Sequence, residues 1–380
     1  MKAATLPIQR PRDARLLVVD SSGRLRHVPR SQLAGQFQAG DLLVGNDAAT
    51  LPASLTGVHA RSGAAIEVRL AGRHSLDVND VRAFTAIVFG AGDYRTRTEE
   101  RPSPPPLAPG DVLALGPLRS TVVRMLGHPR LVDLRFEGEV DAIWAGIARH
   151  GRPIQYAHLS ERLALWDVWT RFAALPVAFE APSAGFALDW ASLAALRSRG
   201  VGFATLTHAA GISSTGDAAL DARLPLDEPY HLPAVTVRAI EDTRRRGGRV
   251  VALGTTVTRA LEHAAAQRGG VASGFATATN RIGRNSPLRV VDAIVSGTHE
   301  PGSSHHALLG AFADDGTLAR IDAALEAHGY RTHEFGDSVL IERGAKVARA
   351  ASAQCPQARS NLKTATLASR LGSVRTTLPA

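Results

Sequence analysis

A change of pattern near residue 140 does most to limit how this chain can fold. Between residues 65 and 138, short segments of alternating apolar and polar residues are separated by Gly, Pro and Asp. From residue 141 onward, apolar strand-like segments alternate with segments of helical period. The first pattern is typical of a small antiparallel β-barrel and the second of an α/β layer structure. Because strand-like segments also precede residue 60, we predict a discontinuous α/β domain with an inserted barrel.

We place the α/β domain at residues 1–60 and 141–343 and the inserted barrel domain at residues 61–140. Residues 344–380 form a basic tail that is rich in Ser, Thr and Ala, and we predict it to be disordered. Within the α/β domain, Asp141 and Asp189 are the expected N-caps of two helices. A further helix is expected over residues 159–175, ahead of Pro176.

Composition narrows the class of protein. The single cysteine among 380 residues, Cys355, excludes an internal disulfide framework and a cysteine-based zinc site. No apolar run approaches the ~20 residues of a membrane span, and no signal peptide is recognisable, so we expect a cytoplasmic protein. The net charge of +9 suggests an anionic partner, but six of those nine charges lie in residues 344–380. The tail is either a solubilising extension or an arm that follows phosphates.

The most informative local motif spans residues 249–262. A strand-like run ends at Gly254, Thr255 and Thr256 follow, and a helix begins. Free backbone N–H groups at a helix start bind carboxylate or phosphate, and threonine hydroxyls can cap or donate. Arg259 and Glu262 lie three positions apart and can form an ion pair on the helix. A plain capped helix with a surface ion pair has the same pattern, so the motif alone identifies no function.

Polar loops beside other predicted strands supply further candidates. Residues 296–306 contain three histidines, among them His299, but their spacing fits no common metal-ligand set, so we predict an organic-substrate loop and no metal. His333 and Asp337 precede the last strand and support acid–base chemistry or form a polar turn. Residues 181–185 and 205–214 are loops of small residues that either bind a ligand or only connect neighbouring helices and strands. The patterns of a serine-hydrolase elbow, a dinucleotide fold and a phosphate loop are absent from the sequence.

Taken together, seven segments resemble, in the same order, those of the S-adenosylmethionine:tRNA ribosyltransferase-isomerase family. They are residues 40–57, 181–185, 205–214, 227–233, 248–262, 290–301 and 330–341. The resemblance covers about residues 15–343 and implies a discontinuous α/β domain that carries a small barrel. It also implies an enzyme of queuosine biosynthesis, which transfers the ribosyl group of S-adenosylmethionine onto 7-aminomethyl-7-deazaguanine in tRNA. Epoxyqueuosine forms, adenine and methionine leave, and no cofactor is implied beyond S-adenosylmethionine as co-substrate.

The resemblance implies roles for individual residues. The expected cradle for the methionine carboxylate consists of Gly254, Thr255 and Thr256, with Arg259 as counter-charge. The expected catalytic residues are His299 and Asp337 for proton transfer and Glu228 for holding the ribose or the base. Ser183 and Gly185 are expected to line the nucleoside. The other expected substrate-binding residues are Asn46, Asp47, His208, Glu262 and His333.

The sequence departs from the commonest family pattern in its ligand loops. Residues 46–49 read Asn-Asp-Ala-Ala where the family commonly has Asn-Asn-Thr-Arg, so a basic residue that could meet phosphate is missing. Three functions therefore stay open: the tRNA-modifying enzyme, an S-adenosylmethionine-dependent transferase or lyase acting on a small molecule, and a non-catalytic ligand- or RNA-binding relative. Because no heptad pattern is present, we expect a monomer.

Overall fold

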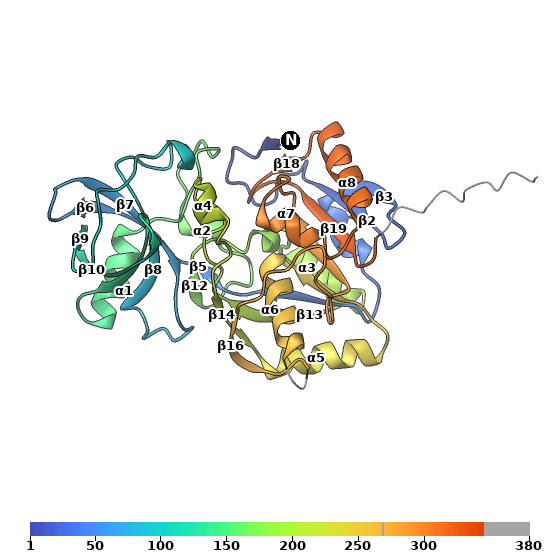
Figure 1. The fold of residues 1–380 in the computed structure, drawn as a ribbon. Helices are drawn as coiled ribbons and strands as arrows, with labels where there is room; N and C mark the ends of the chain where they lie inside the picture. Colours follow the sequence, from blue (N-terminus) through green and yellow to red (C-terminus); the bar gives the residue numbers. More distant parts are fainter. Residues whose placement is uncertain (268–269, 346–380) are drawn as a thin grey trace, which may run out of the picture. The chain divides into compact units, whose positions relative to one another are not determined.

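The computed structural model describes residues 1–267 and 270–345, all of which belong to one compact unit. The predicted disordered tail lies, from residue 346 onward, outside the described residues, and so does Cys355. Figure 1 shows the strands of a barrel grouped apart from the strands of a larger sheet.

The larger sheet has nine strands, and its middle four run parallel. In spatial order the strands are β16 (Gly274–Ala278), β14 (Glu228–Leu232), β13 (Gly202–His208), β4 (Leu42–Asn46), β15 (Val250–Leu253), β17 (Ala293–Gly297), β19 (Ser338–Glu342), β2 (Arg15–Val19) and β3 (Leu25–Pro29). The parallel group is β13, β4, β15 and β17. Its four carboxyl ends meet at one edge of the sheet, which is the usual ligand edge of α/β folds.

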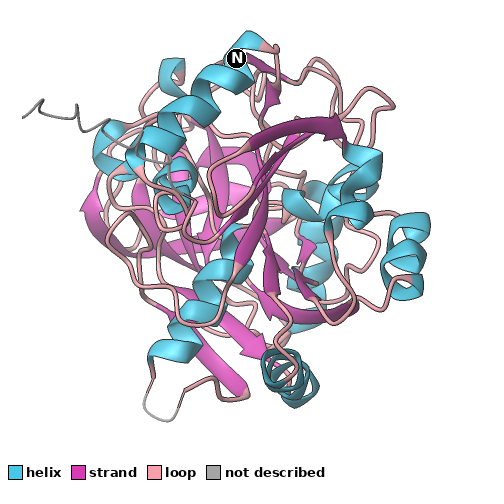
Figure 2. Ribbon diagram, turned by 90° about the vertical axis from the view of Figure 1, so that its right-hand side faces the viewer, coloured by secondary structure: helices cyan, strands magenta, loops and turns pink. Residues whose placement is uncertain are grey.

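Helices cover both faces of this sheet, because its central strands are apolar on both faces. In β4, Leu42 and Val44 pack into one core and Leu43 into the core on the opposite face. The first core receives α5 (Ala234–Arg245), α6 (Thr255–Ala266), α7 (Ser304–Leu309) and α8 (Asp315–Ala327). The second receives η1 (Arg30–Gln36), η3 (Ser183–Ala187) and α3 (Trp190–Ser198). Figure 2 shows helices arranged around the outside of the strands.

Six antiparallel strands close into a barrel with its own core. They are β6 (Ser54–His59), β7 (Ala65–Gly72), β8 (Ala83–Phe89), β9 (Val112–Leu115), β10 (Leu118–His128) and β11 (Leu131–Phe136). Helix α1 (Val140–His150) buries Ile143 and Ile147 against this core. The predicted α/β fold with an antiparallel barrel is therefore confirmed, while the domain boundaries themselves stay a prediction.

The remaining described elements are short. They are β1 (Lys2–Ala3) paired with β18 (Arg331–Thr332), β5 (Ala49–Thr50) paired with β12 (Pro176–Ala178), and the single turns η2 (Thr98–Glu100), α2 (Leu165–Val168) and α4 (Ala218–Asp221).

The predicted helix over residues 159–175 is wrong, since α2 is the only helical part of it. Leu159, Leu163 and Val168 are buried in a small cluster with Phe186 and Phe335. Side chains also take the backbone donors that a helix would use, because Leu163 N–H donates to Gln155 Oε1 and Ala164 N–H to Asp167 Oδ2.

One of the two predicted caps is confirmed. The Asp189 carboxylate accepts the N–H of Ser192 at 2.7 Å and begins α3. Asp141 is not a cap, because Glu139 occupies the N-cap position of α1 and Asp141 lies in its first turn.

Candidate active site

A cavity of about 270 Å³ opens at the carboxyl ends of the parallel strands. Leu253 and Gly254 close β15, Ser296 and Gly297 close β17, and the loop after β13 completes the wall. Because these ends share one sheet edge, segments far apart in the sequence converge on a single site. Seven residues named from the sequence line the cavity: Ser183, Glu228, Gly254, Thr255, Thr256, Arg259 and His299.

The start of α6 forms an anion-binding wall of this cavity. Gly254 has a φ of 101°, a conformation that suits glycine, and its N–H donates to the Val295 carbonyl at 2.8 Å. No side chain caps the helix. The first N–H groups of α6, at Thr255 and Thr256, are therefore open to a ligand anion.

Arg259 forms part of the cavity wall, but its guanidinium already binds protein groups and is not free for a ligand. It pairs with the buried Glu228 carboxylate and donates to the carbonyls of Leu226, Ala278 and Asn280. The predicted ion pair of Arg259 with Glu262 is therefore wrong. The Glu262 carboxylate instead accepts three backbone N–H groups. These donors belong to Arg289, Val290 and Val291.

Glu228 is the centre of a buried network below the cavity. Its carboxylate lies 3.1 Å from His208 Nε2 and accepts the Gly211 N–H at 2.6 Å. Burial opposes the charged form of Glu228, but the hydrogen bond with His208 and the charges of His208 and Arg259 outweigh it and lower its pKa. The Asn46 side chain fixes His208 through two 2.9 Å backbone hydrogen bonds.

Four other predicted residues, on or beside the sheet, do not line the cavity. Asn46 and His208 support its floor from below, as the network shows. Asp47 accepts the Thr207 hydroxyl at 2.6 Å, next to the end of β13. At Gly185 an added Cβ would lie 2.7 Å from Thr170 Cγ2, so this glycine permits close packing of η3.

His299 follows β17 and lies between Ser296 and His305. Its Nε2 is 2.8 Å from Ser296 Oγ, and its ring centroid is 4.8 Å from that of His305. Burial, followed by the nearby histidines, lowers the pKa of His299 well below its usual value of 6.5. The imidazole is therefore neutral at pH 7 and able to accept a proton.

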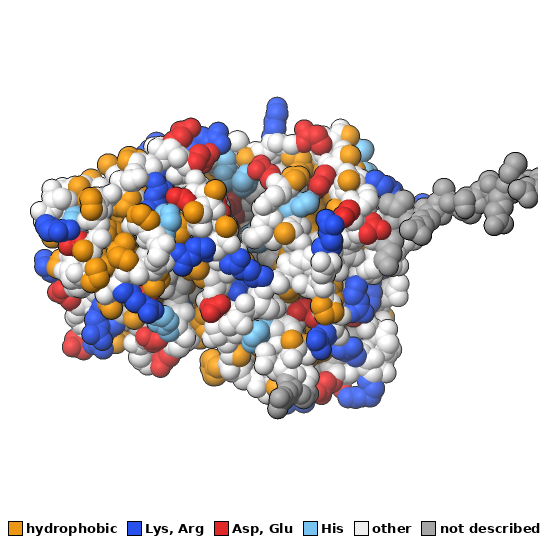
Figure 3. Space-filling view, viewed as in Figure 1, with side chains coloured by type: hydrophobic (Ala, Val, Ile, Leu, Met, Phe, Trp, Pro, Cys, Tyr) orange, Lys and Arg blue, Asp and Glu red, His pale blue; other side chains and the backbone are white. Residues whose placement is uncertain are grey.

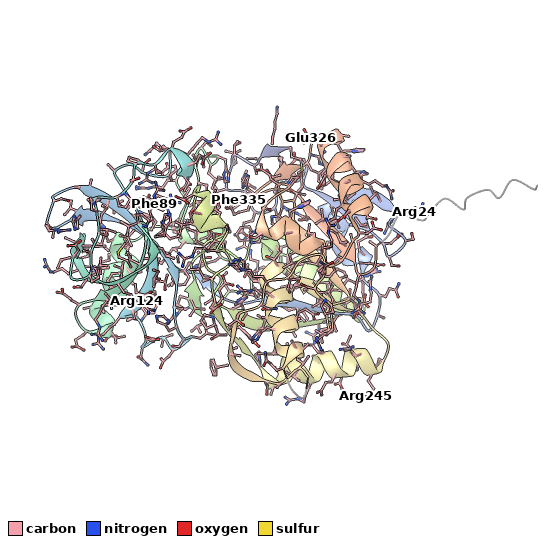
Figure 4. All side chains as sticks on the ribbon, viewed as in Figure 1. Arg24, Phe89, Arg124, Arg245, Glu326 and Phe335 are labelled. Atoms are coloured by element: carbon pink, nitrogen blue, oxygen red, sulfur yellow. The ribbon has the colours of Figure 1, made fainter. Side chains whose placement is uncertain are left out.

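A second chamber of about 110 Å³ adjoins the main cavity and shares seven wall residues with it, His299 among them. Figure 4 labels Phe335, which lines this chamber. Tyr156 donates its hydroxyl to the Glu180 carboxylate there, and the Ser213 N–H donates to the other oxygen at 3.1 Å. Burial raises the pKa of Glu180 to about 7. A carboxyl that titrates near neutral pH suits general acid–base catalysis.

Sequence reasoning missed Tyr156, Glu180 and His305. His305 was visible only as part of a histidine cluster, and Tyr156 and Glu180 belong to no local motif. The hydrogen bond between Tyr156 and Glu180 joins residues that are 24 positions apart, so it depends on packing and not on a local pattern.

The two predicted residues of the last loop separate in space. His333 lines the second chamber. Asp337 lines neither chamber, and its fully buried carboxylate accepts the backbone N–H groups of Arg15 and Arg331, both at 2.8 Å. It thereby holds β2, β18 and β19 together, and its predicted role in proton transfer stays a prediction without support from this geometry.

An open groove of about 700 Å³ continues from the main cavity and shares Pro225 and Arg281 with it. Arg73, Arg223 and Arg281 line the groove, and within residues 1–267 and 270–345 none of them has a carboxylate in ion-pair range. Arg223 and Arg281 donate to backbone carbonyls and stay exposed. The face shown in Figure 3 is hollowed near its middle, with Lys and Arg side chains beside the hollow.

Comparison with known proteins shows similarity to one family over most of the chain. Residues 1–341 match the family described as "Queuosine biosynthesis protein". The chain is 32% identical to the S-adenosylmethionine:tRNA ribosyltransferase-isomerase of Pelobacter propionicus, covering 87% of this chain and 93% of that protein. It is 34% identical to the protein of that name from Citrifermentans bemidjiense, covering 88% and 94%. The solved S-adenosylmethionine tRNA ribosyltransferase from Thermotoga maritima is 25% identical over 89% of this chain and 96% of that chain, with a TM-score of 0.48.

In the part of the chain that the structure describes, no helix combines the length and the apolar character that a membrane crossing requires.

Proposed function

The chain belongs to the S-adenosylmethionine:tRNA ribosyltransferase-isomerase family, and from that premise we propose that it catalyses the ribosyl transfer of queuosine biosynthesis. S-Adenosylmethionine donates its ribosyl group to 7-aminomethyl-7-deazaguanine in tRNA, epoxyqueuosine forms, and adenine and methionine leave. The observation that carries this proposal is the convergence of seven motif residues on one cavity at the sheet's ligand edge.

The main cavity and the second chamber together suit a ligand of this kind. Their volumes of about 270 and 110 Å³ join through shared walls and reach the range of small-molecule sites. The methionine carboxylate binds at the start of α6, against the N–H groups and hydroxyls of Thr255 and Thr256. Arg259 contributes indirectly, because its guanidinium is used to hold Glu228 in place.

The proton transfers fall to His299 and Glu180, which both belong to the wall that the main cavity and the second chamber share. A sulfonium acidifies the adjacent ribose C5′–H, and the neutral His299 imidazole can accept that proton. Adenine leaves with the electron pair of the glycosidic bond and must be protonated, which Glu180 can do because its pKa is about 7. The acceptor amine then forms a C–N bond to the ribose-derived carbons and loses a proton. A ribose oxygen closes the epoxide on the carbon that carried sulfur, and methionine leaves with the electron pair of that C–S bond.

The groove beside the cavity favours tRNA as the acceptor over a small molecule. The exposed Arg223 and Arg281 provide positive charge, and neither forms an ion pair within residues 1–267 and 270–345, while Asp227 is the one acidic residue among those that line the groove. Such a groove attracts a phosphate backbone, and it offers a basic surface although residues 46–49 lack the family's arginine.

Mass spectrometry of the products made from S-adenosylmethionine, with and without tRNA that carries the aminomethyl-deazaguanine base, tests the activity. We expect adenine, methionine and epoxyqueuosine only when that tRNA is present. Release of adenine or methionine without tRNA would establish the small-molecule alternative. Absence of S-adenosylmethionine binding in calorimetry would exclude both enzymatic functions and support a non-catalytic relative.

The groove has its own test. Arg281→Ala and Arg223→Ala should weaken tRNA binding and reduce its salt dependence by about one phosphate contact each. Arg245, an exposed arginine on α5 that Figure 4 labels, provides the matched control, and Arg245→Ala should leave tRNA affinity unchanged. Equal affinities for all three variants would exclude the groove as the tRNA site.

A further inference from the structure

Three potential metal ligands meet at the second chamber, outside the groups that the proposed reaction uses. They are His158, His333 and Glu334, and one ligand atom from each lies within 4.8 Å of the others. His158 Nε2 is 3.2 Å from Glu334 Oε2, and the two imidazole rings stack with centroids 4.2 Å apart. We propose that these three side chains form a binding site for a divalent transition-metal ion of the zinc class.

The donor set fits such an ion. Imidazole nitrogen and carboxylate oxygen are ordinary zinc ligands, and three protein ligands leave a position for water or a fourth group. Glu300 is a candidate for that position, because its Oε1 lies 3.7 Å from His333 Nε2. Zinc bound by nitrogen or oxygen at about 2.0–2.2 Å brings ligand atoms to about 3.3 Å from one another, so binding requires these side chains to close in by rotation.

The charge of the chamber also favours a cation. Glu180 and Glu334 are both among the residues that line it, whereas none of its lining residues is Lys or Arg. The Glu334 carboxylate, in a partly buried space whose lining holds no Lys or Arg, lowers the free energy of a bound cation. The side chains of His158 and Glu334 are 14% and 27% exposed and that of His333 is 37% exposed, so a bound ion would be partly buried and would face solvent on the His333 side.

The backbone presents two of the ligands in a fixed position. His333 has a φ of 69°, and among the residues that the structure describes it is the only one other than glycine with a positive φ. Such a conformation persists only where its surroundings hold it, and it is concentrated at functional sites. Here Gly336 holds the turn, because its N–H donates to the His333 carbonyl at 2.9 Å and an added Cβ would lie 2.3 Å from the Arg331 carbonyl.

A bound ion would join two loops that are distant in the sequence. His158 and Glu334 are 176 positions apart, on the loop between α1 and α2 and on the loop between β18 and β19. Both loops form walls of the second chamber, so occupancy would fix the width of the chamber beside Glu180. The sequence did not indicate this metal site, because its ligands lie on two loops that are distant in the sequence and share no local motif.

Zinc binding to the full-length, tag-free chain tests the site. A Cys355→Ser background removes the single thiol, and a chromophoric chelator in competition reports affinity and stoichiometry. We expect one tight site, which His158→Ala, His333→Asn and Glu334→Gln each weaken by about tenfold or more. Asn tolerates the positive φ of residue 333, so this variant keeps the turn. In the parent protein, but not in the three variants, zinc should raise the thermal midpoint.

The chain offers a matched control for two stacked imidazoles. His27 and His328 stack with centroids 3.8 Å apart, and the His27 Nδ1 atom lies 3.0 Å from the Tyr330 hydroxyl, which is not a metal ligand of the proposed kind. His328→Ala should leave zinc affinity unchanged. Unaltered affinity in the three ligand variants, or an equal loss in His328→Ala, would overturn the site. Cobalt absorption supplies a second readout, because ligand loss should abolish its d–d bands.

Discussion

Glu180→Gln should stabilise the folded protein at high pH and at the same time impair catalysis. Burial raises the pKa of Glu180 from 4.5 to about 7, so the folded state holds a proton that the unfolded state has released between these values. For a carboxyl with a raised pKa, stability falls as pH rises through that window and stays low above pH 7. At 1.36 kcal/mol per pH unit, the ionised carboxylate costs the folded state roughly 3 kcal/mol at pH 8.5 and under about 1 kcal/mol at pH 5.

Gln resembles the protonated acid in shape and stays neutral at every pH. It keeps an oxygen for the Tyr156 hydroxyl but loses the acceptor for the Ser213 N–H, which costs about 1 kcal/mol independently of pH. The free energy of unfolding of Glu180→Gln relative to wild type should therefore rise by about 2–3 kcal/mol between pH 5 and pH 8.5. Urea unfolding of both proteins at the two pH values measures this difference.

Glu241, exposed on α5, provides the control, because Glu241→Gln should show the same difference from wild type at both pH values. A difference for Glu180→Gln that does not change with pH would refute the reasoning, since Glu180 would then not titrate near 7. Turnover of Glu180→Gln should fall by about 10²- to 10⁴-fold, the usual contribution of a general acid. A variant that is more stable at high pH and fully active would remove Glu180 from the mechanism.

Three further outcomes follow from the site. Arg259→Leu leaves the buried Glu228 carboxylate without its partner and should lower the free energy of unfolding by about 3–5 kcal/mol in urea, whereas the double variant with Glu228→Gln should lose less. Gly254→Ala forces a positive φ of 101° on alanine and brings its Cβ within 3.1 Å of Ala184, so it should cost about 1–3 kcal/mol and weaken S-adenosylmethionine binding in calorimetry. His299→Ala should reduce turnover by about 100-fold or more with little change in S-adenosylmethionine affinity, and protonation of His299 should not limit wild-type activity until the pH is well below 6.5.

Local signals in the sequence were sufficient for the fold and for one wall of the site. Alternation of apolar residues identified the barrel strands, and the step from strand to helix at Gly254 identified the anion-binding end of α6. Both features depend on residues that are neighbours in the chain. The domain boundaries and the tail from residue 346 onward stay predictions.

Long-range contacts explain what the sequence did not reveal. A helix was predicted over residues 159–175, but Leu159 and Leu163 belong to a buried cluster with Phe335, which lies far along the chain. Arg259 has Glu262 within reach on its own helix, yet it pairs with Glu228, 31 positions away. A local pattern shows only which partners lie within reach on the same helix. In the folded protein, a buried charged group pairs with the partner that leaves the fewest neighbouring polar groups without a hydrogen bond.

This selection changes what a loss of activity would mean at the predicted catalytic residues. Glu228 and Asp337 were expected to act on substrate, but each is a buried carboxylate whose oxygens are occupied by donors from the scaffold. Replacing either one leaves buried donors unpaired, so activity would fall even if neither touches the reacting atoms. Glu180 differs, because burial without a paired cation holds its pKa near 7 and keeps a proton exchangeable at the wall of both chambers. A loss of activity therefore identifies a chemical role only where stability and pH dependence are measured on the same variant, and Glu180 is the carboxylate where the two are expected to move in opposite directions.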